Sequence, residues 1–322
     1  MRALLVSSNP ADKAFFTDVA KAASIPIQEV ASANEACDEL LKDAAAFVIV
    51  DVSEAAQYQD FEKAVSDKIG MFSATLVPNN IFYVSSKPLY ECDFLRNTEI
   101  FGHFIERSFN EIDKTLIGRV FAMAGKERAF GIEKYFASDA RGQTIPITKT
   151  IQKKVIIESL KNHLVKIGFK ARMATVISNA IDELIMNAIF DAPVDELGRR
   201  PHEKTSRNAV FDLEGKDAVE LKVVFDGKLL GISVADNHGS LDRKKLVAQH
   251  LGRSYSTSEY QTKVNIANAG LGLSQVFRNC GGLVFACDNG TRTEVTLFYR
   301  KTVSFKEFKD QFRFLSTFVY FS

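Results

Sequence analysis

The sequence has almost no net charge, no closely spaced cysteines and no apolar run long enough to cross a membrane. Its 322 residues include 41 Lys and Arg against 40 Asp and Glu, a formal net charge of +1. This balance excludes a broad electrostatic footprint for nucleic acid or for an anionic membrane surface. No stretch approaches the ~18 apolar residues of a spanning helix, and the first apolar run is too short for a signal peptide.

The cysteines Cys37, Cys92, Cys280 and Cys287 stand far apart or in unrelated patterns, and none forms a Cys-x-x-Cys motif. This argues against a disulfide framework and a zinc site. The cytoplasm is therefore the predicted location, with neither membrane nor nucleic acid as a partner. The hydrophobic fraction of 46% and the charged fraction of 25% are typical of a soluble globular protein. At ~150 residues per domain, the length predicts two domains.

Residues 1–115 alternate short apolar runs with helical patterns. Two runs, 47–50 and 81–84, are wholly apolar and are followed by Asp51 and Ser85. Short apolar strands that alternate with helices are typical of a parallel sheet covered on both faces. The first domain is thus predicted as an α/β, doubly wound parallel sheet. Residues 116–150 are interpreted as a connecting helix and linker.

The second half has long helices first and hairpins afterwards. Apolar residues recur at helical spacing over 151–167 and over 171–190. Two later pairs of apolar runs flank Asp226-Gly227 and a loop with Asn289-Gly290, which are hairpin signals. Helices followed by antiparallel strands predict an α+β sandwich with a mixed, mostly antiparallel sheet over 151–300. An aromatic-rich tail, 301–322, follows.

Three polar residues on the helix of 171–190 fall at the spacing i, i+4 and i+8, which places them on one side of a helix. They are Asn179, Glu183 and Asn187. A carboxylate and a carboxamide one turn apart can serve as an acid–base group and as an oxygen ligand to Mg²⁺. Taken alone, the pattern is more typical of a solvated polar face.

Two further motifs follow along the chain. Asp236 ends an apolar strand and leads into a turn, where it could accept a hydrogen bond from a ligand amine or simply cap an ordinary turn. The segment 268–273 (Asn-Ala-Gly-Leu-Gly-Leu) places two glycines at the start of an apolar helix. Such a start lets backbone N–H groups approach a phosphate, although two glycines alone are a weak signal.

The order of these motifs is more specific than any one of them. Glu183 to Ala188, then Asp236-Asn237, then Gly270 to Leu273, then Gly281-Gly282 and a closing hairpin resemble the GHKL ATPase superfamily. That superfamily includes DNA gyrase, histidine kinases and anti-sigma serine kinases, the last being closest in style. The resemblance covers about residues 150–300.

The resemblance implies a Bergerat-type site for ATP and Mg²⁺. In it, Asn187 would ligate the metal, and Asp236, helped by Thr293, would hold the adenine amino group. Glu183 would be the catalytic carboxylate, a residue that is Asn in many histidine kinases. The phosphates would run along the segment from Gly270 through Leu271 to Gly272.

The sequence departs from the family pattern in the turn after Asp236. The family's Asp-x-Gly-x-Gly would place glycines at His238 and Ser240, whereas the only glycine here is Gly239, which is predicted to be the cofactor-binding glycine of this turn. Residues 242–267 would form the lid over the nucleotide. Its candidate phosphate contacts are basic residues, namely Lys244, Lys245, Arg253 and Lys263.

The first domain resembles, more weakly, a response-regulator receiver. Asp51 stands where the phosphoacceptor belongs, and Ser85 where Ser or Thr follows the fourth strand. The acidic pair after the first strand is replaced by Ser7-Ser8, and the lysine after the fifth strand by Glu106 or Arg107. Without that pair a metal ion is poorly held, so a degenerate receiver serving as a binding or dimerisation surface is predicted.

Together these features predict a signalling protein that binds ATP and Mg²⁺ and either hydrolyses ATP slowly or transfers a phosphoryl group to the hydroxyl of a regulatory protein partner. An alternative is a non-catalytic module whose interactions respond to nucleotide. A true histidine kinase is a third reading, but no phosphoacceptor motif precedes the ATPase region, and His163 lacks the acidic neighbour typical of one.

Overall fold

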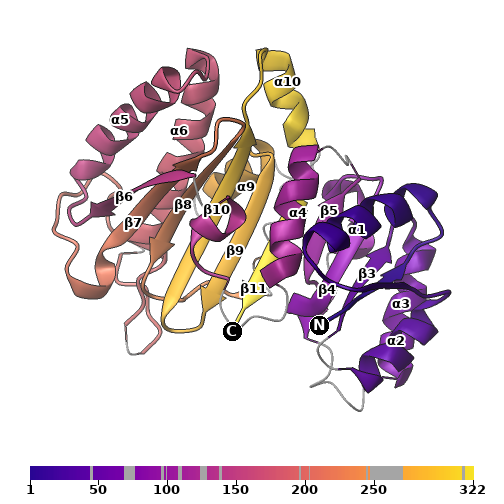
Figure 1. Ribbon diagram of the computed structural model, residues 1–322. Helices are drawn as coiled ribbons and strands as arrows, with labels where there is room; N and C mark the ends of the chain where they lie inside the picture. Colours follow the sequence, from indigo (N-terminus) through magenta and orange to yellow (C-terminus); the bar gives the residue numbers. More distant parts are fainter. Residues whose placement is uncertain are drawn as a thin grey trace. The chain divides into compact units, whose positions relative to one another are not determined.

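Parallel and antiparallel strand pairs both occur in the computed structural model, which makes the chain mixed α/β (Figure 1). The structure describes residues 1–43, 46–68, 77–95, 98, 100–107, 111–123, 129–137, 140–195, 197–202, 204–243, 246, 271–313 and 316–322. Two compact units are distinguished. Unit 1 comprises Met1–Ala129 with Ser316–Tyr320, and unit 2 comprises Phe130–Leu315 with Phe321–Ser322.

Unit 1 alternates strands and helices along the chain. Its elements are β1 (Ala3–Val6), α1 (Pro10–Ala22), β2 (Ile27–Glu29), α2 (Ala33–Lys42), β3 (Phe47–Asp51), α3 (Ala55–Lys68), η2 (Pro78–Asn80), β4 (Ile81–Ser85), η3 (Leu89–Glu91), η4 (Asp93–Leu95), β5 (His103–Glu106), α4 (Glu111–Met123) and, from the end of the chain, β11 (Ser316–Phe321). The strand order is β2-β1-β3-β4-β5-β11. The first five strands are parallel, as the apolar runs predict, and β11 is antiparallel to β5.

The sheet order of unit 1 reverses between β1 and β3. In a doubly wound sheet, the carboxyl ends of the strands at this reversal form the usual place for a functional site. Asp51 closes β3 and Ser85 closes β4, and both lie buried at that edge. Helix α4, predicted as part of a connecting segment, packs against α1, and its Phe121 ring contacts Phe47 at 4.9 Å.

The C-terminal strand of unit 1 is fastened by a buried histidine. One ring nitrogen of His103, Nε2, lies 2.8 Å from the Asn79 carbonyl, while Nδ1 accepts the Val319 N–H at 3.0 Å. These two contacts assign the proton to Nε2. The predicted aromatic tail, 301–322, thus contains a helix, α10 (Phe305–Asp310), a 3-10 turn, η9 (Gln311–Arg313), and a paired strand, β11.

Unit 2 is built on antiparallel strands in the order β9-β10-β8-β7-β6. Its other elements are η5 (Ile132–Tyr135), β6 (Arg141–Ile147), α5 (Gln152–Lys166), α6 (Ala171–Met186), a π-helical turn η6 (Asn187–Asp191), η7 (Gly215–Asp217), β7 (Val219–Phe225), β8 (Leu229–Asp236), α9 (Leu271–Arg278), β9 (Gly282–Asp288) and β10 (Arg292–Arg300). The segment 141–147, interpreted from sequence as a loop, is instead an edge strand paired with β7. That interpretation was wrong.

The two faces of the unit 2 sheet carry different elements. On one face, here named the helix face, Phe285 contacts Phe277 of α9 at 5.8 Å, and helix α6 packs on β8. On the other, the strap face, Phe298 contacts Tyr135 of η5 at 5.4 Å. Residues 130–136, here named the strap, cross this face, and Figure 1 shows them in front of β8 and β10 with α9 behind.

Contrary to the expectation from the sequence, one helical stretch among the described residues, Ala171–Asp191, is long and apolar enough to span a membrane by length and composition alone. In its most apolar window, 67% of the residues are buried inside the protein. Burial of this kind is typical of the core helix of a soluble protein.

Candidate functional site

Three side chains form a row across the helix face of unit 2. Thr293 on β10 lies directly opposite Asp236 on β8 and, on its other side, opposite Cys287 on β9. Paired residues of neighbouring antiparallel strands point to the same face of a sheet. The predicted adenine ligands, Asp236 and Thr293, are therefore brought together, with Cys287 as a neighbour that the sequence did not single out.

Asp236 is a buried carboxylate with a network of donors. Only 6% of it is exposed, and its Oδ1 accepts the His238 N–H at 2.9 Å. Burial raises the pKa of Asp236 above its ordinary value, and the hydrogen bonds from the His238 and Gly239 backbone and from Thr293 oppose that rise. A buried acceptor at a strand end suits recognition of a ligand amine.

The turn after Asp236 is fixed by Gly239 and Ser240. Gly239 has a φ of +57°, and a Cβ on it would overlap the Asp288 carbonyl oxygen. The Ser240 hydroxyl donates to the Ala192 carbonyl at 2.7 Å, which ties the turn to the end of η6. The one glycine of this turn thus occupies the position that requires it, although the family pattern places its glycines one residue to either side.

The predicted acid–base and metal residues lie where α6 changes to a π-helical turn. Glu183 is in the last turn of α6 with 30% of its side chain exposed, and Arg207 Nη1 is 3.9 Å from its Oε2. Asn187 is half-buried and begins the π turn, whose widened geometry lets the Asn187 carbonyl accept the Ala192 N–H at 2.8 Å. Such turns are frequent at functional sites. Asn179, the third residue of the predicted stripe, is exposed.

The predicted phosphate segment is described only in part. Leu271 and Gly272 form the first turn of α9, and this helix packs against α6. Gly270 lies outside the described residues, as do Lys244, Lys245, Arg253, Lys263 and most of the predicted lid. The start of α9, the end of α6 and the Asp236 row therefore belong to elements packed on one face of the sheet.

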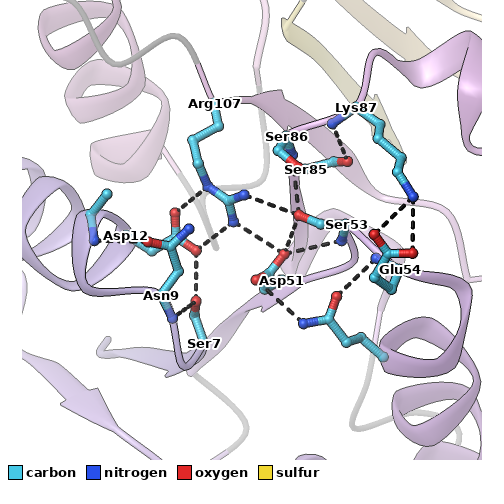
Figure 2. A network of polar contacts seen from close by, with 12 residues as sticks. Ser7, Asn9, Asp12, Asp51, Ser53, Glu54, Ser85, Ser86, Lys87 and Arg107 are labelled. Atoms are coloured by element: carbon cyan, nitrogen blue, oxygen red, sulfur yellow. Dashed lines mark hydrogen bonds and ion pairs between the residues drawn. The ribbon is translucent and has the colours of Figure 1, made fainter.

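A second polar cluster lies at the carboxyl edge of the unit 1 sheet (Figure 2). Arg107, directly after β5, donates from Nε to Asp12 Oδ1 at 2.6 Å and from Nη2 to Asp12 Oδ2 at 2.7 Å. The same Nη2 lies 3.1 Å from Asp51 Oδ1, and Nη1 lies 3.0 Å from Ser53 Oγ. The Ser7 hydroxyl donates to Asp12 Oδ2 at 2.6 Å. One guanidinium therefore bridges both carboxylates.

Asp12 is the residue of this cluster that sequence reasoning missed. It lies in the first turn of α1 and is fully buried. Of the two candidates to replace the receiver lysine, Arg107 reaches the carboxylates, whereas the Glu106 carboxylate accepts the Leu89 N–H. Burial alone would lower the pKa of Arg107, but hydrogen bonds and charges from Asp12 and Asp51 raise it. The guanidinium therefore stays charged, as a counter-ion to both acids.

We expect Asp51 to remain unmodified on incubation with a small phosphodonor such as acetyl phosphate. Its Oδ1 already receives the Ser53 N–H at 3.0 Å, the Ser53 hydroxyl at 2.6 Å and the Arg107 guanidinium. No group of three or more His, Cys, Asp or Glu in the described residues has the arrangement of a metal site. Intact-mass analysis after incubation with acetyl phosphate shows whether Asp51 stays unmodified. A stoichiometric gain of one phosphoryl group at Asp51 would contradict the degenerate-receiver interpretation.

No family model matches this chain, and no curated protein gives a significant match to it.

Proposed function

We propose that the protein binds ATP with Mg²⁺ at the helix face of unit 2 and uses it in a signalling role, by slow hydrolysis or by phosphoryl transfer to a hydroxyl of a regulatory protein partner. The observation that carries this proposal is the Asp236–Thr293 pair. These residues lie directly opposite each other on neighbouring strands, and Asp236 is buried. The resemblance to GHKL ATPases assigns the same two residues to adenine.

The surrounding elements support the proposal. Helix α6, which carries Glu183 and is followed directly by Asn187, packs on both β8 and α9. The carboxamide oxygen of Asn187 is a hard ligand suited to Mg²⁺, which is usually held by one or two protein oxygens together with phosphate and water oxygens. When bound, Mg²⁺ would neutralise the charge of the phosphates. Glu183 can accept a proton from water or from a hydroxyl nucleophile, and a carboxamide there could not.

Asp236→Asn is expected to weaken ATP binding about ten- to hundred-fold. The change places an amide donor in front of the adenine amino group and removes a charge-assisted hydrogen bond of ~1.5–3 kcal/mol. Isothermal titration calorimetry with and without Mg²⁺ measures it. Asp212→Asn, an exposed aspartate that pairs only with Lys149 among the described residues, is the matched control. Equal affinity of the Asp236→Asn variant and the parent would refute the adenine assignment.

The raised pKa of Asp236 also predicts how ATP affinity depends on pH. Only the ionised carboxylate makes the stronger, charge-assisted hydrogen bond to the amine, so ATP affinity should fall as the pH drops through that pKa. Because burial is the cause of the shift, the loss should begin at a higher pH than an exposed aspartate would give.

A non-catalytic module is the second candidate function, since the Asp236–Thr293 pair suits binding whether or not turnover follows. Product analysis separates the two. Release of phosphate, or label on a protein hydroxyl, supports the enzyme, and label on a histidine would support the third reading, a histidine kinase.

A further inference from the structure

The strap lies tightly on the face of the unit 2 sheet opposite the proposed nucleotide site. Two strap residues are buried: Ile132 is 0% exposed and Tyr135 is 1% exposed. Gly231 of β8 makes this contact possible, because a Cβ on it would stand 2.8 Å from the Phe136 ring and 2.9 Å from Ile132. The absence of a side chain at Gly231 is therefore a condition for docking of the strap.

A buried carboxylate holds the strap to β10. Glu294 is 2% exposed, and its Oε1 accepts the Gly131 N–H at 2.9 Å. Its Oε2 lies 3.5 Å from Arg292 Nη2, and the Arg292 guanidinium lies 5.9 Å from the centre of the Phe130 ring. A carboxylate is costly to bury. Its shortest polar contact is with a backbone amide of the strap, the Gly131 N–H at 2.9 Å, so the docked strap offsets part of the cost of burying this carboxylate.

Glu294 and the proposed adenine contact are consecutive residues of one strand. Successive side chains of a strand point to opposite faces, so Glu294 faces the strap while Thr293 faces the helices and lies opposite Asp236. A displacement of β10 at Glu294 therefore moves Thr293 as well. In the sequence, the strap is the first part of unit 2 and directly follows the segment Met1–Ala129 of unit 1.

We propose that Glu294 is a positioning residue of the nucleotide site: by clamping Gly131, it fixes the place of Thr293 beside Asp236 and couples docking of the strap to ATP affinity. This inference rests on the proposed function. The coupling is reciprocal, so bound ATP holds the strap down by the factor by which the docked strap strengthens ATP binding.

Hydrogen exchange of peptides that cover residues 130–136 reports docking of the strap without nucleotide, and calorimetry reports ATP affinity. Glu294→Ala should speed exchange in the strap and weaken ATP binding at least about fivefold, the lower end of ordinary coupling between sites. Glu294→Gln keeps an oxygen acceptor for the Gly131 N–H and should stay closer to the parent in both measurements. In the parent, saturating ATP should slow exchange in the strap.

Gly231→Ala provides an independent variant should Glu294→Ala fail to fold, because its methyl group displaces the strap without touching Glu294. A released strap with unchanged ATP affinity, in either variant, overturns the coupling while leaving the nucleotide site standing. A parent that binds no ATP removes the proposed function and the coupling together. Strap exchange that is unaffected by ATP in a parent that does bind it overturns the coupling alone.

Discussion

Arg107→Ala is expected to lower the free energy of unfolding of unit 1 by about 3–5 kcal/mol, the usual cost of removing one partner of a buried ion pair. The substitution leaves Asp12, fully buried, and Asp51, 7% exposed, without their shared cation. Two carboxylates at one site then repel each other, and each has lost charge-assisted hydrogen bonds. The unfolding transition in urea, followed by circular dichroism, measures the loss.

Lys114→Ala is the matched control for this prediction. Lys114 pairs with Asp18 at 3.1 Å, an aspartate with 62% of its side chain exposed, and surface pairs of this kind contribute about 0–1 kcal/mol. Adding Asp12→Asn to Arg107→Ala should cost less than the sum of the single changes, since the carboxylate that was left unpaired is then neutral. An Arg107→Ala variant as stable as the Lys114→Ala control would show that the guanidinium is not needed to hold these acids.

The strands of unit 1 were predictable because their signal is local. Wholly apolar runs such as those of β3 and β4 indicate strands buried on both faces, and the structure confirms the mixed α/β class that they imply. Strand β6 was missed because Gly142 and Pro146 interrupt any alternation, and because an edge strand has little apolar surface to bury. Its pairing with β7 is a long-range property that no local pattern shows.

The residues of the candidate sites likewise fall into two classes: those with a local signal in the sequence and those whose placement depends on residues far away along the chain. An aspartate in the first turn of a helix, such as Asp12, is favoured there for local reasons, so its burial becomes visible only through Arg107, far away in the sequence. Thr293 was singled out through a family resemblance, and its place opposite Asp236 follows from strand register. The π turn at Asn187 leaves no mark in an apolar helical pattern. The roles of Gly270 and of the lid stay predictions, since these residues lie outside those described.

The two polar residues at the end of α6 have separable roles in the proposed function. Asn187→Ala should abolish the Mg²⁺-dependent part of ATP binding, because it removes the only proposed protein oxygen on the metal. Glu183→Gln should leave ATP binding nearly intact, because the amide is close in size to the carboxylate and Glu183 is not proposed to contact the base or the metal. Calorimetry with and without Mg²⁺ distinguishes the two variants.

Glu183→Gln should lower the rate of turnover by about 10²–10⁴-fold, the usual cost of losing a general base. The Glu183 side chain is 30% exposed, and its ion-pair partner Arg207 lies 3.9 Å away, so the carboxylate is accessible to a water or hydroxyl nucleophile. Release of labelled phosphate measures the rate, and Glu158→Gln, on the exposed side of α5, is the control. Equal rates for Glu183→Gln and the parent would remove Glu183 from the chemistry and leave the nucleotide site standing. A parent that binds ATP but neither hydrolyses it nor labels a partner would instead favour the non-catalytic module, in which Glu183 has no proton to accept.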